Sequence, residues 1–225
     1  MILRLMIGAV LASALWAPSA RANGQLDSSF AGGRTASYWP IDAGGLRGAT
    51  TPVQTLVQRD DKVLVISNTP TPFGSQFPGN SQIGITRLNS NGSVDLSYGP
   101  LGQRLLDAGP DFEVEVVDAA LRRDGALLVL GTLYGPFNQS DMAVWALLPN
   151  GEPDPAFGSN GFRRVRRGGS PSDRAGALVP YLLESDRFLI VGDLRDGTSG
   201  NHSLMQVVLF ADSGTLCAAS DCGNV

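Results

Sequence analysis

The sequence has few of the residues from which catalytic and metal sites are most often built. Its 225 residues include one histidine, His202, and two cysteines, Cys217 and Cys222. A structural zinc site usually needs four nitrogen or sulfur ligands, and these three residues do not supply them. His202 has no recognisable acid and nucleophile around it, so no Ser-His-Asp triad is predicted. We expect no catalytic residue, no metal and no cofactor.

The sequence also lacks a helical pattern. After residue 22, no stretch keeps apolar residues three and four positions apart over the length of a helix, and 28 glycines and 14 prolines would interrupt one. No long apolar run follows residue 22 either, which predicts no transmembrane segment in the mature chain. The expected fold is therefore all-β.

Positive charge is scarce. Lysine and arginine together number 17 against 21 aspartates and glutamates, which gives a net charge of −4. Because neutralisation of phosphates by lysine and arginine supplies most nucleic-acid affinity, this balance excludes nucleic acid as an expected partner.

Residues 1–22 have the pattern of a signal peptide. Arg4 precedes an apolar run over 5–16, and Ala20-Arg21-Ala22 gives a small-x-small cleavage site. The run is shorter than the roughly 20 residues that span a bilayer. We expect cleavage before Asn23 and export to a periplasmic or extracellular location, where Cys217 and Cys222 would form a disulfide that pins the C-terminal end.

One short motif occurs three times, over 26–30, 94–99 and 153–158. Each copy follows a glycine, Gly24, Gly92 or Gly151, and Gly214 opens a degenerate fourth copy, at spacings of 68, 59 and 63 residues. A near-constant period indicates a repeat architecture. The predicted domain, 23–225, then comprises units of approximately 24–91, 92–150 and 151–213 and a degenerate cap, 214–225.

Each unit repeats the same order of short apolar runs separated by turn residues, a pattern typical of hairpins. The expected strands are 53–58, 62–67 and 83–88, then 116–122, 126–131 and 142–148, then 177–183, 187–192 and 204–210. The motif itself is expected to form a closing strand, with an isolated one near 26–35. Four strands per unit fit a propeller blade. Because propellers usually have four to eight blades, about three four-stranded blades predict an open arc or incomplete β-propeller, or a ring completed by a second copy.

The repeated residues carry a resemblance to a known family. The matching positions are Asp124, Gly125, Leu130 and Gly131 in a hairpin, and Gly92, Asp95, Tyr98, Gly99 and Gly102, repeated as Gly151, Asp154, Phe157, Gly158 and Gly161. This pattern resembles the delta-60 repeats, which are tandem bacterial repeats of β-propeller type and unsettled function. Asp61 and Asp186 depart from it at the hairpin glycine and Ala31 at a motif glycine. The resemblance implies a bacterial propeller-type protein.

The motif residues recur once per unit, which favours a structural role. An aspartate that accepts backbone N–H groups in a turn explains the recurrence of Asp27, Asp95 and Asp154, and calcium binding or catalysis is the alternative. The aromatic residues Phe30, Tyr98 and Phe157 are expected to pack between blades. Gly99 and Gly158 complete the motif.

Two charged clusters each occur in a single unit of the repeat. Asp107, Asp111, Glu113, Glu115 and Asp118 are acidic, and strand alternation places Glu113 and Glu115 on one face. They would be an acid/base pair, a calcium site or a solvated surface. Arg163, Arg164, Arg166 and Arg167 would hold an anionic group or protect an edge strand from pairing.

The function that the sequence favours is binding. The loops 37–52 and 68–82 are long and contain aromatic residues, including Trp39, that suit a glycan or protein partner. The predicted function is a non-enzymatic interaction scaffold. The alternatives are a secreted hydrolase or lyase that uses the acids of 107–118, and a truncated repeat relic without an independent role.

Overall fold

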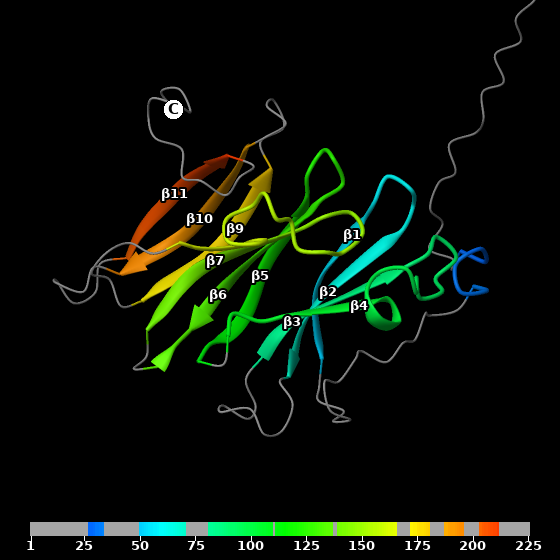
Figure 1. Ribbon diagram of the computed structural model, residues 1–225, viewed down its shortest axis with the longest axis horizontal. Coiled ribbons are helices and arrows are strands. Elements are labelled where there is room, and N and C mark those ends of the chain that lie inside the picture. Colours follow the sequence, from blue (N-terminus) through cyan, green and yellow to red (C-terminus); the bar gives the residue numbers. More distant parts are fainter. Residues whose placement is uncertain are drawn as a thin grey trace, which may run out of the picture.

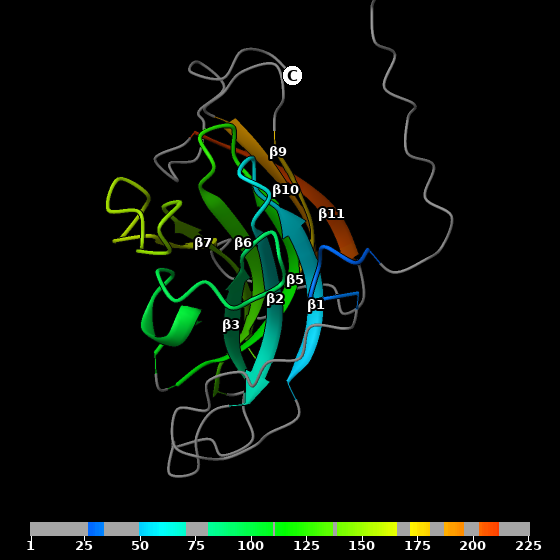
Figure 2. The same cartoon turned by 90° about the vertical axis from the view of Figure 1, so that its right-hand side faces the viewer.

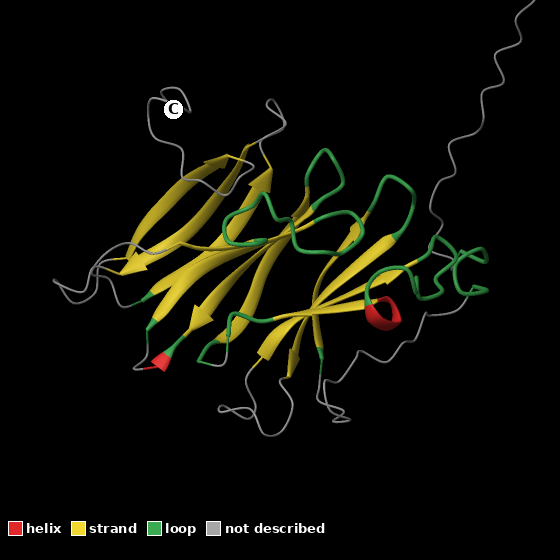
Figure 3. Cartoon of the chain, in the orientation of Figure 1, coloured by secondary structure: helices red, strands yellow, loops and turns green. Residues whose placement is uncertain are grey.

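The computed structural model describes residues 27–33, 50–70, 81–109, 111–136, 139–165, 172–180, 187–195 and 203–211. At 81, 194–195 and 203–211 only the backbone is described. Strands dominate these residues, and a 3-10 turn covers Pro100–Gly102 (Figure 3). The all-β prediction is confirmed.

The described strands form three antiparallel sheets, which we call the first, second and third blades. The first blade contains β1 (Thr51–Val57), β2 (Val63–Pro70), β3 (Ser81–Leu88) and β4 (Gln103–Leu106). The second contains β5 (Glu113–Leu121), β6 (Leu127–Tyr134), β7 (Ser140–Leu147) and β8 (Phe162–Val165). The third contains β9 (Asp173–Pro180), β10 (Arg187–Arg195) and β11 (Ser203–Ala211). Strands next to one another in sequence are neighbours in each sheet.

The blades stand side by side in chain order and form an incomplete, propeller-like arc (Figure 1). A view turned by 90° shows the three sheets one behind another, with β10 and β11 inclined to β1 and β2 (Figure 2). The predicted fold class is thereby confirmed. The sequence predicts that the third blade has lost its closing strand in the segment from Cys217 to Cys222, which lies outside the described residues.

The first three strands of every blade fall where the sequence predicts them, but the predicted closing strand is wrong. In the first blade the motif at 94–99 forms turns, and the outer strand β4 follows it. In the second blade the motif at 153–158 likewise precedes β8. Residues 27–33, expected within an isolated closing strand, also form turns. The motif therefore connects the third and fourth strands.

Two apolar cores hold the arc together, one between each pair of neighbouring blades. The first core joins Leu64, Ile66, Ile83 and Ile85 of the first blade to Val114, Val129, Leu133 and Trp145 of the second. The second core joins Leu128, Leu130, Met142 and Val144 of the second blade to Leu178, Phe188 and Ile190 of the third. Because the two faces of the second blade belong to different cores, burial depends on stacking of successive blades.

The first strand of each blade contains a β-bulge, and in the first two blades the residue after the bulge makes a polar contact with the next blade. The pairing register shifts at Val53, Val117 and Gly176. After the first two bulges, the side-chain oxygens of Gln54 and Asp118 accept the Ala119 N–H at 2.6 Å and the Leu178 N–H at 2.8 Å. The corresponding residue after the third bulge is Ala177, which has no side-chain acceptor.

The first blade has a different composition on the face turned away from the second. Strand alternation and the pairing register place Ser67, Thr69, Gln82 and Thr86 on this outer face. The Ser67 hydroxyl donates to the Gly84 carbonyl at 3.2 Å. In the second blade, the positions that correspond to Thr69 and Thr86 are Leu133 and Trp145, which belong to the first core. Short polar side chains thus replace large apolar ones on the outer face.

Candidate functional site

The repeated aspartate forms the same turn in all three copies. Asp27, Asp95 and Asp154 each accept the backbone N–H two residues later, at 2.8, 3.0 and 3.0 Å. The backbone N–H of the aromatic residue bonds back to the aspartate carbonyl in each copy, at Phe30, Tyr98 and Phe157. The three aspartates therefore have equivalent local surroundings, which is what a building element of each repeat requires.

The aromatic residue of one motif packs on the opening glycine of the next. A Cβ atom on Gly92 would lie 3.1 Å from the Phe30 ring, and one on Gly151 would lie 2.7 Å from the Tyr98 ring. Both glycines also have a positive φ, 81° and 87°, where glycine is favoured. The glycine that opens each motif thus makes room for the aromatic residue of the preceding copy.

Asp95 carries the densest group of charges in the first blade. Its Oδ2 lies 2.8 Å from Arg87 Nε and 3.1 Å from Lys62 Nζ. The side chains of Asp95 and Arg87 are 8% and 7% exposed. Burial acts to raise the pKa of Asp95, but bonds from the Ser97 hydroxyl and N–H, the Lys62 ammonium and the Arg87 guanidinium outweigh it, and the pKa lies far below its usual value.

Arg87 connects this group to the second blade. Its Nη1 donates to the Pro149 carbonyl at 2.6 Å, and its guanidinium lies 4.4 Å from the centre of the Tyr98 ring. In the second blade, Arg122 Nη1 contacts Asp154 at 3.3 Å and Arg122 Nη2 contacts Asp124 at 3.1 Å. The motif aspartates of both blades are therefore bound by arginines at the same end of the sheets.

Tyr98 tests whether a buried hydroxyl contributes to stability. The hydroxyl is buried without a hydrogen-bond partner, and burial raises the pKa of Tyr98 to about 12, against the opposing charges of Arg87 and Arg104. The equivalent residue of the next copy is Phe157. We expect Tyr98→Phe to change the free energy of unfolding at pH 7 by less than about 1 kcal/mol, because no hydrogen bond is lost.

The same substitution should alter stability in alkali. The unfolded tyrosine loses its proton near its usual pKa of 10.0, whereas the folded one keeps it to about pH 12. The contribution of Tyr98 to the free energy of unfolding is therefore complete below pH 10 and falls as the pH rises from 10 to 12. Tyr98→Phe should make this loss of stability smaller. Urea unfolding at pH 7, 10 and 11 measures both effects. A large loss at pH 7 would show that the hydroxyl has a partner in solution.

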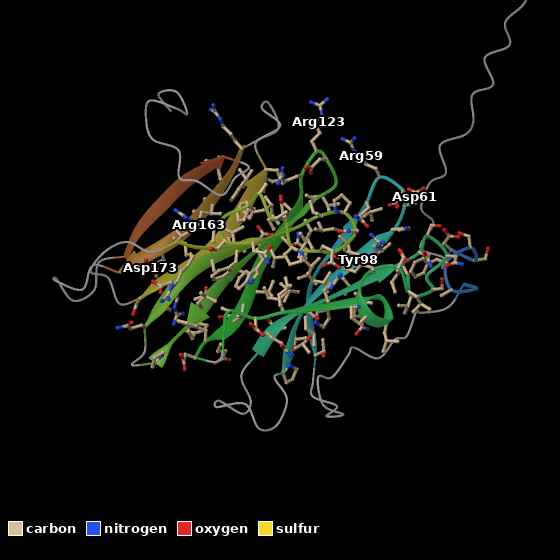
Figure 4. All side chains as sticks on the ribbon, in the orientation of Figure 1. Arg59, Asp61, Tyr98, Arg123, Arg163 and Asp173 are labelled. Atoms are coloured by element: carbon tan, nitrogen blue, oxygen red, sulfur yellow. The ribbon has the colours of Figure 1, made fainter. Side chains whose placement is uncertain are left out.

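A pocket opens at the same end of the blades. Its volume is about 510 Å³. Hairpin residues 57–60 of the first blade and 121–125 of the second line it, together with Arg87, Pro149, Pro180 and Arg187. Figure 4 shows Arg59 and Arg123 at the tips of neighbouring hairpins, with Arg163 and Asp173 elsewhere on the molecule. The pocket thus combines side chains that are far apart in the sequence and come from all three blades.

Arginine dominates the lining of this pocket. Five arginines and two aspartates line it, although the chain as a whole is negative. Arg59 and Arg123 are exposed, and within the described residues their side chains make no hydrogen bond or ion pair. Gln58, which is 9% exposed, has a buried Oε1 without a hydrogen-bond partner. The pocket therefore offers free cationic groups and an unused polar acceptor.

The acidic cluster of 107–118 does not form one site in the described structure. Asp118 joins the second and third blades, Asp107 accepts the Gly109 N–H at 3.1 Å, and Glu115 accepts the Tyr134 hydroxyl. Glu113 and Glu115 do alternate with the buried Val114 and Val116. Among the described residues, no ion pair joins this cluster to Arg163 or Arg164.

The described arginines of the basic cluster lie in β8, the outer strand of the second blade. Arg164 binds Asp141 through Nε at 2.7 Å, and its guanidinium lies 4.7 Å from the centre of the Phe112 ring. Arg163 is half-buried. Trp39, Arg166, Arg167, Cys217 and Cys222 lie outside the described residues, as do the signal peptide and most of both long loops.

Sequence reasoning missed the pocket at the hairpin ends. A signal was present, because Arg59-Asp60 and Arg123-Asp124 occupy the same hairpin position in consecutive units. The described residues contain no group of three or more acidic, histidine or cysteine side chains close enough to hold a metal ion. They also contain no helix of the length and apolarity that a membrane crossing requires.

The comparisons with known proteins agree with this architecture. A family model described as a domain of unknown function (DUF5122) beta-propeller matches residues 73–98. This segment covers β3 and the second copy of the motif up to Tyr98. No curated protein matches the chain. The family match and the three repeated sheets support a β-propeller repeat family, so this chain is a propeller-like repeat protein.

Proposed function

We propose that this protein is an exported, non-enzymatic binding scaffold that holds its ligand in the pocket at the hairpin ends. The observation that carries the proposal is the joint construction of this pocket by all three blades. Turns fixed by a rigid scaffold are common recognition sites, and pockets of about 300–1,000 Å³ hold small ligands. The acids of 107–118 do not gather in one site, which supports a binding protein over a hydrolase or lyase.

The proposal of export rests on the signal-peptide pattern of residues 1–22. Mass spectrometry of protein recovered from the periplasm or the medium would support it by finding Asn23 as the first residue. A glycan or protein is the kind of ligand that we propose. Association with a second copy stays a prediction from the sequence, and the molar mass in solution measures it.

Blocking the pocket tests the proposed function. Pro149 is exposed and lines the pocket, whereas Pro136 is exposed at the opposite ends of the strands. The ligand is sought in an array of oligosaccharides and peptides. We expect it to bind the wild-type chain and the control Pro136→Trp but not Pro149→Trp. We also expect it to be recovered chemically unchanged. Circular dichroism checks that both variants are folded. Equal binding by the two variants would place the ligand elsewhere, and cleavage of the ligand would support the enzyme alternative.

A further inference from the structure

We infer that the pocket binds an oxyanion, carboxylate or phosphate, carried by a ligand with hydroxyl groups, such as an acidic sugar. This inference rests on the proposed function, since it names the ligand class of the same site. Two features of the lining carry it: the excess of arginine at the rim and the unused acceptor of Gln58 below it.

Some charged side chains of the pocket are paired with an opposite charge, and others are not. Arg87 lies in the wall and is neutralised by Asp95, while Arg122 is held by Asp124 and Asp154. Asp60 lies 3.6 Å from Lys62, so it also has a cation beside it. Arg59 and Arg123 remain at the rim with no ion pair among the described residues. A ligand would therefore meet two guanidinium groups that no described carboxylate neutralises.

Guanidinium groups favour a particular ligand chemistry. Their planar N–H donors match the two oxygens of a carboxylate or phosphate, and the charge-assisted bonds that result are stronger than neutral ones. Arg59 and Arg123 occupy equivalent positions at the tips of adjacent hairpins (Figure 4), and both line the pocket. This arrangement suits one oxyanion held between two hairpins.

Gln58 adds a requirement for hydroxyl groups. Its Oε1 is buried and has no partner, which is costly unless a donor reaches it. An ionised carboxylate is an acceptor and cannot supply that donor, whereas a sugar hydroxyl can. Val57, Leu121, Pro149 and Pro180 give the pocket apolar surface beside these groups. The lining as a whole fits a sugar ring with an acidic substituent.

Calorimetric titration with defined probes tests this inference. The probes are a galacturonic acid trisaccharide, a glucose phosphate and a neutral glucose trisaccharide, each at low and high salt. We expect an acidic probe to bind and the neutral one not to, with binding weakened by salt. The acidic probe that binds distinguishes a carboxylate source from a phosphate source. The double variant Arg59→Gln/Arg123→Gln should bind about 10- to 100-fold more weakly, and the control Arg163→Gln should match the wild type.

Gln58→Met tests the second feature, because it keeps the length of the side chain and removes the acceptor. It should weaken binding of the galacturonic acid trisaccharide more than binding of acetate, a further probe that has a carboxylate but no hydroxyl donor. Neutral and acidic probes that bind equally, or full affinity in the double variant, would overturn the inference. If a neutral ligand bound as tightly as the acidic ones and Pro149→Trp abolished its binding, the proposed function would stand and only the ligand class would be wrong. If Arg163→Gln alone lost binding, the anion site would lie on β8 and both proposals would fail.

Discussion

Replacement of Asp95 by alanine is expected to lower the free energy of unfolding by about 3–5 kcal/mol, because it leaves the buried Arg87 guanidinium without its carboxylate. Lys62 and Arg87 would then face one another as like charges without the carboxylate between them, since both cations contact Asp95 Oδ2. The turn bonds to Ser97 would also be lost. Urea unfolding at pH 7, followed by tryptophan fluorescence and circular dichroism, measures the change.

Asp27→Ala is the matched control. Asp27 makes the same turn bonds to Ser29, but it is exposed and meets no cation among the described residues. We expect no resolvable change in the urea midpoint of this variant. If the two substitutions were equally harmful, the turn and not the buried ion pair would account for the effect.

The Asp95 ion pair also predicts a sensitivity to acid. The pKa of Asp95 in the folded chain is lower than its usual value of 3.8. As the pH falls, the unfolded chain therefore takes up this proton first. The stabilisation is complete above about pH 4 and is lost on further acidification through the folded pKa. Asp95→Asn should show a shallower loss of stability below pH 4 than the wild type.

Substitution of Gly161 by alanine is expected to cost about 3 kcal/mol or more. Gly161 has a φ of 84°, where an alanine is strained. A Cβ atom would lie 2.8 Å from the Ala146 carbonyl oxygen and 2.8 Å from Pro153 Cβ. These atoms belong to the backbone of β7 and to the motif turn, which cannot move without disturbing the pairing of β7 with β8.

Gly125→Ala separates the backbone strain from the collision. Gly125 has a φ of 87°, but its nearest neighbour to a new Cβ would be Pro149 Cγ at 3.6 Å, an ordinary contact. We expect a cost of about 1–2 kcal/mol from the backbone conformation alone. Thermal and urea unfolding of both variants give the difference, and a Gly161→Ala variant no less stable than Gly125→Ala would contradict the packing that we describe.

The hairpins of each blade could be predicted because their signals are local. Arg123-Asp124-Gly125 separates two apolar runs, and the structure has a turn with a positive φ at Gly125. The motif resembles a strand in the sequence because Val94-Asp95-Leu96 alternates apolar and polar residues as a strand does. Its aspartate turn and the positive φ of Gly99 and Gly102 bend the chain instead. Alternation over so few residues does not distinguish a strand from a sequence of turns.

The pocket is hard to predict because no single segment contains it, and the repeated Arg-Asp pairs of the hairpins are its one signal in the sequence. Arg59 and Arg123 are separated by a whole repeat, and each resembles a solvated turn residue when its hairpin is considered alone. The contacts of Gln54 and Asp118 with the next blade were missed for the same reason. Their side chains cross between sheets, so their partners depend on how the blades stack.

The outer face of the first blade gives the repeat array a direction. Apolar area drives one sheet onto another, and this face presents Thr69 and Thr86 where the second blade presents Leu133 and Trp145. The polar side chains of this face are already buried, with Ser67 7%, Thr69 3%, Gln82 6% and Thr86 5% exposed, so this face is not open to a further blade. A blade added after the third one would meet Ala177 there, and Ala177→Asp would supply the side-chain acceptor that Gln54 and Asp118 supply between the described blades.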